Sequence, residues 1–338
     1  MLSMDAFNDK AFSMVSLTAA INNIDYVPNL LGSLGIFEDT PVYTRTIGVE
    51  KKGQTLSLIP TSPLGAAPRE TDRDGRDIRD LRTVRLADSF TLYAYEVEGI
   101  RAFGTESEFE SLQVEYAGRM AKVRTNMELT HEYHRLGALQ GKLLDADGTS
   151  VIYNYFTEFG IAEPAAIDFN LDDVNTDVWA KCQLVKRAVI RASKGVFTPA
   201  SSVHALAGDA FYDALTQHPK VFQFYMNWQA AQQIREVKAF ESFEFGGIVW
   251  HNYRGTDDNS TVAIPVDEAK FFPVNAPGVF VKAMAPAEFG PFVNTRGQDT
   301  YAINVLDKDR QAWTKGELYS YPLYLCARPD VLQKATRT

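Results

Sequence analysis

The sequence is poor in cysteine, with only Cys182 and Cys326 among 338 residues. Two cysteines cannot build a disulfide framework, so we expect buried thiols and a core that holds without covalent links. No stretch approaches 18 uninterrupted apolar residues, so no membrane-spanning helix is predicted. A basic stretch followed by a long apolar run is missing near residue 1, so we expect no secretory signal peptide.

Basic residues are in the minority. The chain has 34 Lys and Arg against 43 Asp and Glu, a formal net charge of −9, which argues against a nucleic-acid-binding surface over most of the protein. Apolar residues make up 45% and charged residues 23%, as in globular proteins, so collagen-like, disordered and coiled-coil chains are excluded. The length predicts roughly two domains at about 150 residues each.

Recognisable catalytic and metal-binding motifs are missing as well. There is no G-x-S-x-G elbow, no Walker A loop and no G-x-G-x-x-G after a strand. His131 and His134 are three residues apart, whereas zinc proteases need histidines four apart around a glutamate, so we interpret both as polar residues on a helix face. The aspartates at 145–148 and 257–259 are interpreted as a hairpin turn and an exposed loop. We therefore predict no enzyme, no metal and no cofactor.

A long hairpin is predicted near the start of the chain. Residues 43–50 and 55–59 alternate and are rich in β-branched side chains, and residues 90–97 alternate again. Between them lies a charged, turn-rich segment at 60–88. We expect two strands flanking an extended tip, and connections of that length are usually functional or disordered.

The tip has a dense pattern of both charges. Eleven of the seventeen residues from 69 to 85 are charged, and arginine recurs every third residue from 73 to 85. Such a run is either a solvated surface or a mixed-sign surface that docks on a neighbouring molecule, where it would set register and partner choice. The predicted intersubunit contacts are Arg69, Glu70, Asp72, Arg73, Asp74, Arg76, Asp77, Arg79, Asp80, Arg82 and Arg85.

The remaining pattern predicts an α+β protein. The strongest helix covers 106–138, where apolar residues recur at spacings of three and four. A hairpin at 139–156 and a helix at 174–193 follow, the latter with Val174, Val178, Cys182, Val185 and Val189 on its inner face. Further on we expect a strand at 203–206 and a hairpin at 238–253 that turns at the glycine pair 246–247.

The C-terminal half resembles a known family. Several blocks occur in one order over about 130 residues, and together they resemble the lambda-type phage major capsid proteins, the capsid protein E family. The blocks lie at 203–215, 243–255, 267–273, 277–280, 285–288, 293–295, 322–323 and 328–332.

The resemblance implies the fold of tailed-phage capsid proteins, which has an arm, an extended loop, a peripheral domain with a long spine helix, and an axial domain. In this sequence the expected boundaries are 1–42 for the arm, 43–98 for the extended loop, 99–172 for the peripheral domain with its helix near 106–138, 173–310 for the axial domain and 311–338 for a strand that returns to the peripheral domain.

The implied function is structural: hexamers and pentamers of one chain form an icosahedral head that encloses double-stranded DNA. The expected location is the virion, with assembly in the host cytoplasm and no membrane. Because only about 42 residues precede the extended loop, we expect a separate scaffold protein, together with a portal, a decoration protein and non-specific contact with packaged DNA. Two alternatives stay open: an encapsulin-like compartment, and an α+β hydrolase that gathers His204, His218 or His251 with acids.

Overall fold

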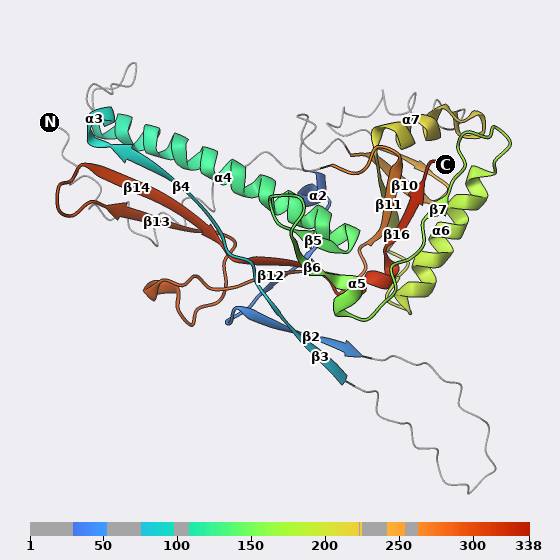
Figure 1. Ribbon diagram of the computed structural model, residues 1–338, viewed down its shortest axis with the longest axis horizontal. Helices are drawn as coiled ribbons and strands as arrows, with labels where there is room; N and C mark the ends of the chain where they lie inside the picture. The colour runs from blue at the N-terminus through green and yellow to red at the C-terminus, as the bar shows by residue number, and fades with distance from the viewer. Residues whose placement is uncertain (1–29, 53–75, 98–107, 223, 225–241, 254–262) are drawn as a thin grey trace, which may run out of the picture.

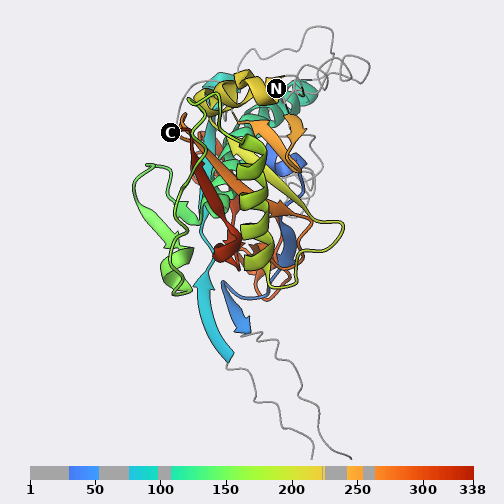
Figure 2. The same ribbon diagram turned by 90° about the vertical axis from the view of Figure 1, so that its right-hand side faces the viewer.

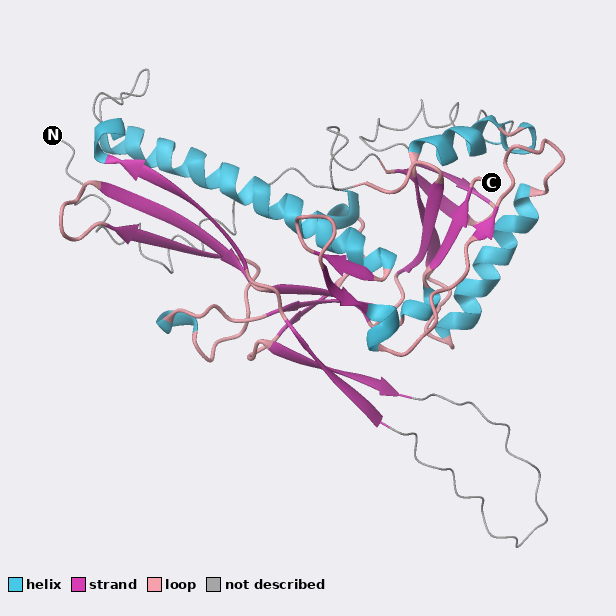
Figure 3. Cartoon of the chain, in the orientation of Figure 1, coloured by secondary structure: helices cyan, strands magenta, loops and turns pink. Residues whose placement is uncertain are grey.

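The computed structural model describes residues 30–52, 76–97, 108–222, 224, 242–253 and 263–338. These residues form an elongated molecule (Figure 1). A long helix with its own sheet makes one end, a six-stranded sheet with two helices makes the other, and a two-stranded hairpin projects between them. Helices and strands are mixed along the chain, as the predicted α+β class requires (Figure 3).

The helix expected over 106–138 is α4, Glu108–Gln140. Its buried apolar stripe contains Tyr116, Met120, Val123 and Met127, which pack on the sheet of β13 (Tyr301–Leu306), β14 (Trp313–Ser320) and β4 (Leu86–Tyr93). The helix ends at Gly141, whose φ of +80° is unfavourable for other residues. A Cβ there would also lie 2.3 Å from the Phe156 ring, so this position requires glycine.

We predicted that residues 90–97 form the second strand of the projecting hairpin, and this pairing was wrong. These residues do not return along the hairpin; the first four belong to β4, which pairs antiparallel with β14, and Ala94–Val97 form the short helix α3. The alternation correctly indicated a strand. Its partner lies far along the chain, so the pairing could not be inferred locally.

The other end of the molecule is built on a mixed six-stranded sheet, with α6 (Val178–Ser193) and α7 (Asp209–Gln217) as its two helices. In spatial order its strands are β7 (Ile167–Asp168), β16 (Gln333–Thr336), β11 (Glu268–Val274), β8 (Ser202–Ala207), β10 (Ile248–Asn252) and β9 (Ser242–Phe245). Within 311–338, β14 returns to the strands beneath α4 and pairs with β4, whereas the last described strand, β16, pairs with β11 in this sheet.

The helix predicted at 174–193 begins four residues later. Asp177 caps it, since its carboxylate accepts a hydrogen bond from the Ala180 amide at 3.0 Å. The inner face is as predicted, because Val178, Cys182, Val185 and Val189 are fully buried; Val174, in contrast, lies before the helix and is exposed. The hairpin of β9 and β10 turns at Gly246 and Gly247, with φ of +66° and +76°, which confirms the predicted glycine turn.

A central layer joins the two ends. It consists of the sheet of β1 (Glu38–Pro41), β12 (Phe280–Met284) and β15 (Pro322–Cys326), and of the hairpin of β5 (Lys142–Leu144) and β6 (Val151–Asn154). Short helices complete it: α2 (Leu30–Ser33), α5 (Tyr155–Glu158), and the 3₁₀ turns at Gly290–Phe292 and Pro329–Val331. One buried cluster contains residues from α2, α4, α5, β12 and β15, so the segment at 30–41 is part of the folded body.

The projecting hairpin pairs β2 (Thr46–Lys52) with β3 (Arg76–Arg82). Seven of the seventeen residues from 69 to 85, which we predicted to be the tip, therefore form the returning strand. The reason for the error is that β3 carries only two apolar residues, Ile78 and Leu81, at a spacing of three, and its other positions are Arg and Asp. The usual period-two signal of a strand is absent from such a sequence.

Candidate functional site

The predicted contact residues divide into two groups. Arg69, Glu70, Asp72, Arg73 and Asp74 lie outside the described residues. The others lie on β3 or directly after it: Arg76, Asp77, Arg79, Asp80, Arg82 and Arg85.

The exposed side chains of β3 stand beside a buried anchor. Arg79, Asp80 and Arg82 are exposed, whereas Leu81 is 2% exposed and packs in the central cluster with Ile47 and Val49 of β2. In register, Leu81 faces Ile47. The hairpin thus has an apolar contact to the body at its base and presents charges to the outside.

Hydrogen bonds fix the base of the hairpin further. The Tyr153 hydroxyl accepts from the Arg82 amide at 2.9 Å and donates to the Arg82 carbonyl at 3.1 Å. The Thr83 amide donates to the Arg45 carbonyl, and the Val84 amide donates to the Pro322 carbonyl, both at 2.9 Å. The direction in which the hairpin leaves the body is therefore set by the subunit's own contacts.

Arg85 is engaged within the subunit. Its guanidinium lies 3.2 Å from one oxygen of Glu288, and Arg45 lies 3.4 Å from the other. The two arginines also lie over aromatic rings, Arg85 5.0 Å from the Tyr319 centroid and Arg45 5.6 Å from that of Tyr321. Of the predicted contact residues, Arg85 already has an internal partner, so it is the weakest candidate for a contact with another subunit.

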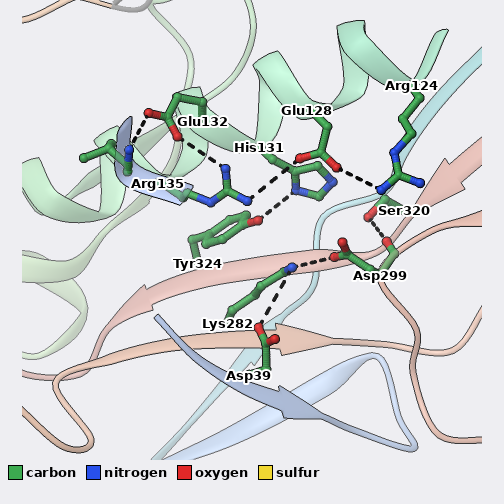
Figure 4. A network of polar contacts seen from close by, with 11 residues as sticks. Asp39, Arg124, Glu128, His131, Glu132, Arg135, Lys282, Asp299, Ser320 and Tyr324 are labelled. Atoms are coloured by element: carbon green, nitrogen blue, oxygen red, sulfur yellow. Dashed lines mark hydrogen bonds and ion pairs between the residues drawn. The ribbon is translucent and has the colours of Figure 1, made fainter. Parts of the chain in front are cut away.

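A buried polar network lies under the C-terminal half of α4 (Figure 4). Arg135 is its centre, 3.3 Å from Glu132 and 3.9 Å from Glu128, and Arg124 lies 3.7 Å from the other oxygen of Glu128. All four side chains are at most 10% exposed. Charges at this depth are tolerated only when they are paired and hydrogen-bonded, so the network has to form as a unit.

The network joins α4 to the segment at 30–41. One oxygen of Glu132 accepts from the Leu31 amide at 3.0 Å and from the Tyr253 hydroxyl at 3.3 Å. On the strand side, Lys282 lies 2.5 Å from Asp299 and 3.9 Å from Asp39 of β1. The arrangement therefore works as a structural clamp between the long helix, the strands and the N-terminal segment.

The two histidines of this helix are also buried, contrary to our interpretation of a polar face. His131 is 1% and His134 2% exposed. The Tyr324 hydroxyl and His131 Nδ1 are 3.0 Å apart. Burial lowers the pKa of His131 to about 3 and that of His134 to about 4. Within the described part of the chain, no group of three or more His, Cys, Asp or Glu side chains could hold a metal ion.

The carboxylates of the network shift in the opposite direction. Burial raises the pKa of Glu128, helped by the nearby Asp299 and opposed by Arg135 and Arg124. Burial likewise raises the pKa of Glu132, although the hydrogen bond from the Leu31 amide and the charge of Arg135 act to lower it. Both groups therefore bind protons more readily in the folded subunit than in the unfolded chain, so acid does not weaken the fold through them.

We predict a histidine-driven loss of stability in acid. A group with a lowered pKa in the folded state contributes stability above its unfolded pKa of 6.5, and the contribution is lost as the pH falls through the folded value. Replacing His134 with phenylalanine should therefore reduce the slope of unfolding free energy against pH by about one proton, or about 1.4 kcal/mol per pH unit, between about pH 4 and 6.5. Urea unfolding of the unassembled subunit at several pH values measures the slope, and equal slopes for variant and parent would refute the assignment.

The histidines of the hydrolase alternative lie partly together. His204 Nδ1 is 3.0 Å from His251 Nε2, and His204 Nε2 is 2.9 Å from the Ser202 hydroxyl. His218 lies apart from this pair and bonds to the Asp173 carbonyl at 3.2 Å. Burial lowers the pKa of His204 to about 4.

No described helix combines the length and the apolar character that crossing a membrane would require.

Comparison with known proteins gives consistent matches over nearly the whole chain. A sequence profile of the family described as phage major capsid protein E matches residues 13–337. The chain is 26% identical to the major capsid protein of Salmonella phage Felix O1 (isolate Felix O1-VT1) over 353 residues, 95% of both chains. It is also 26% identical to the major capsid protein of Pseudomonas phage KPP10 over 319 residues, 88% of this chain and 89% of that protein.

The fold comparison agrees with these matches. A prophage protein from E. coli CFT073, whose crystal structure carries the description of a capsid protein, superposes with a TM-score of 0.60 at 13% identity. The match covers 96% of this chain and 99% of the other. This likeness confirms the predicted tailed-phage capsid fold.

Proposed function

Because this chain belongs to the phage major capsid protein E family, we propose that it is the repeating subunit of an icosahedral phage head, arranged as hexamers and pentamers around double-stranded DNA. The observation that carries this proposal is the hairpin of β2 and β3. It is anchored at its base by Leu81 and Tyr153 and presents Arg79, Asp80 and Arg82 away from the body, an arrangement that suits a neighbouring subunit.

Electron microscopy of the purified protein tests this function. We expect closed shells or ring-shaped capsomers of six and five copies. A protein that stays monomeric over the concentration range in which shells are searched for would contradict the proposal. The encapsulin-like alternative is not favoured, because the family and both curated relatives are phage capsid proteins.

The expected domain boundaries within the subunit are part of the proposal. The arm would cover 1–42, the extended loop 43–98, the peripheral domain 99–172 and the axial domain 173–310. The packing of α4 on β4, β13 and β14 supports a peripheral unit, and the six-stranded sheet with α6 supports an axial one. Residues 311–338 would serve both units, since β14 pairs with β4 and β16 with β11.

The partners follow from the same proposal. Each subunit would contact further copies of itself, and a separate scaffold and a portal would act during assembly. A decoration protein would bind the finished shell, and packaged DNA would make non-specific contacts with its inner side. The protein would be assembled in the host cytoplasm and reside in the virion, and we propose no enzymatic activity, in keeping with a structural family.

Reversing two charges of the hairpin is expected to impair assembly and to spare folding. Arg76 pairs in register with Lys52, and Arg79 with Val49, so glutamate at these positions puts no like charges opposite each other. The R76E/R79E variant should therefore unfold in urea like the parent but yield fewer shells by electron microscopy. Unchanged particle yield would contradict the docking role of β3.

A further inference from the structure

Charge is sharply segregated at the end of the molecule opposite the long helix. Residues 163–177 contain five carboxylates and no Lys or Arg, whereas residues 178–194, which form α6 and its cap, contain five cations and no carboxylate. In a chain of net charge −9, α6 therefore presents a locally cationic surface, which favours encounter with an acidic one.

The outer face of α6 also exposes large apolar side chains. Val178, Cys182, Val185 and Val189 face the core, so the opposite side of the helix faces solvent. There Trp179 is 52%, Leu184 50% and Ile190 41% exposed. We call the helix surface, defined by the following six residues, the α6 face: Trp179, Leu184, Lys186, Arg187, Ile190 and Arg191. Tryptophan and arginine among apolar residues are typical of protein–protein contacts, whereas DNA phosphates offer nothing for Leu184 or Ile190 to bury against.

The carboxylates lie on a segment that is held in place. Asp168 is in β7, which pairs with β16, and the Leu171 amide bonds to the Arg337 carbonyl at 2.9 Å. We call the exposed residues Asp168, Asp172, Asp173 and Val174 the acidic segment. Glu163 is not included, because Lys142 and Lys334 pair with it at 3.1 and 2.7 Å; Asp172 has one longer ion pair, to Arg337 at 3.8 Å, and its side chain stays 59% exposed.

The acidic segment and Trp179 of the α6 face lie toward opposite edges of the six-stranded sheet. In the six-stranded sheet β7 is one edge and β9 the other. Lys181 reaches the Asp168 carbonyl at the β7 edge, whereas Gln183 bonds to Gly246 and Trp179 packs on Phe245 at the β9 edge. Figure 2 views this end directly, with α6 in front. Among the described residues, no salt bridge joins the α6 face to the acidic segment of the same subunit.

We propose that the α6 face binds the acidic segment of a second copy of this chain, head to tail around a capsomer. This rests on the proposed function. Complementary surfaces on two sides of one subunit make a heterologous contact, which closes into a ring when the rotation allows it. The apolar residues Trp179, Leu184 and Val174 would supply buried area, and the charges would set register and speed encounter.

Two charge-reversed variants test the contact. The helix variant is K186E/R187E/R191E, and the segment variant is D168K/D172K/D173K. Either variant alone would set like charges against each other, so we expect the yield of capsomers in native mass spectrometry to fall at least about tenfold. Wild-type protein is run in parallel, and circular dichroism verifies that each variant is folded.

The decisive measurement mixes the two variants in equal amounts. In a head-to-tail ring that alternates between them, every contact is again complementary: wild-type face against wild-type segment, then reversed face against reversed segment. We therefore expect hexamers of three plus three copies and no rings with an odd number. Mixing cannot repair a folding defect, so recovered hexamers would show that the charges act between subunits.

Each result has one meaning. If wild-type protein forms shells and either variant alone does too, or if the mixture stays dissociated, the inference is wrong and the proposed function stands. If only the helix variant fails, the α6 face binds another partner, such as nucleic acid, and the inference is wrong.

If wild-type protein forms no capsomers, the proposed function itself fails. D168N/D172N/D173N is the matched control: it keeps the side-chain acceptors and should assemble with weaker salt dependence.

Discussion

Replacing Arg135 with methionine should lower the free energy of unfolding of the subunit by about 3–5 kcal/mol. The guanidinium is paired with both Glu132 and Glu128 and lies 5.4 Å from the Tyr324 ring centroid. Methionine fills similar volume but leaves Glu132 without an ion pair, because the remaining arginine, Arg124, reaches only Glu128. Urea denaturation of the unassembled subunit measures the loss.

Arg119 provides the matched control on the same helix. It also pairs with two carboxylates, Glu115 at 2.8 Å and Glu96 at 2.9 Å, but its side chain is 31% exposed. Solvent screens such partly exposed pairs, which are worth about 0–1 kcal/mol, and Arg119 also donates to the Thr91 carbonyl at 3.2 Å, so the R119M variant should lose about 1–2 kcal/mol. If R119M and R135M lower the free energy of unfolding by similar amounts, burial is not the reason that Arg135 stabilises the fold.

A compensating substitution separates the charge from the hydrogen bonds. In R135M/E132Q the glutamine still accepts from the Leu31 amide and the Tyr253 hydroxyl, but the unpaired buried charge is gone. We expect this double variant to recover at least about 1 kcal/mol relative to R135M. A double variant that is less stable than R135M would mean that Glu132 is stabilising even without its arginine.

Local features of this fold were predictable because their signals are local. The apolar spacing of α4, the buried valines of α6 and the glycine pair of the β9–β10 turn each depend on residues within a few turns or one hairpin. Pairings between distant segments were not predictable in this way. The strand β4 alternates clearly, yet nothing in residues 86–93 indicates that its partner is β14.

The polar network was missed for a different reason. Arg124, Glu128, Glu132 and Arg135 have the spacing of ordinary solvent-exposed ion pairs on a helix, and exposure is the normal state of such residues. They are buried because β12, β15 and the segment at 30–41 cover the polar side of α4 as well. Apolar residues on one side of a helix and clustered charges of both signs on the other are therefore only a weak indication that both sides are buried. The sequence contains no stronger indication.

The extended loop offers the largest expected effect on assembly. Lys52 and Arg76 are partners at the end of the β2–β3 ladder, so replacing residues 53–75 with Asn-Gly closes the hairpin with a two-residue turn that suits antiparallel strands. The base contacts of Leu81 and Tyr153 are untouched, so the unfolding free energy should change by less than about 0.5 kcal/mol. We expect this variant to form no shells by electron microscopy.

A second variant distinguishes the length of the connection at 53–75 from the identity of its side chains. Replacing residues 53–75 with a Gly/Ser linker of equal length keeps the length of the connection but removes the predicted contacts Arg69, Glu70, Asp72, Arg73 and Asp74. If these side chains recognise a neighbouring subunit, the linker variant should fail to assemble, as the shortened one does. Shells from the linker variant would show that the loop needs only its length, and the contact role would then belong to the described strand β3 alone, where R76E/R79E tests it.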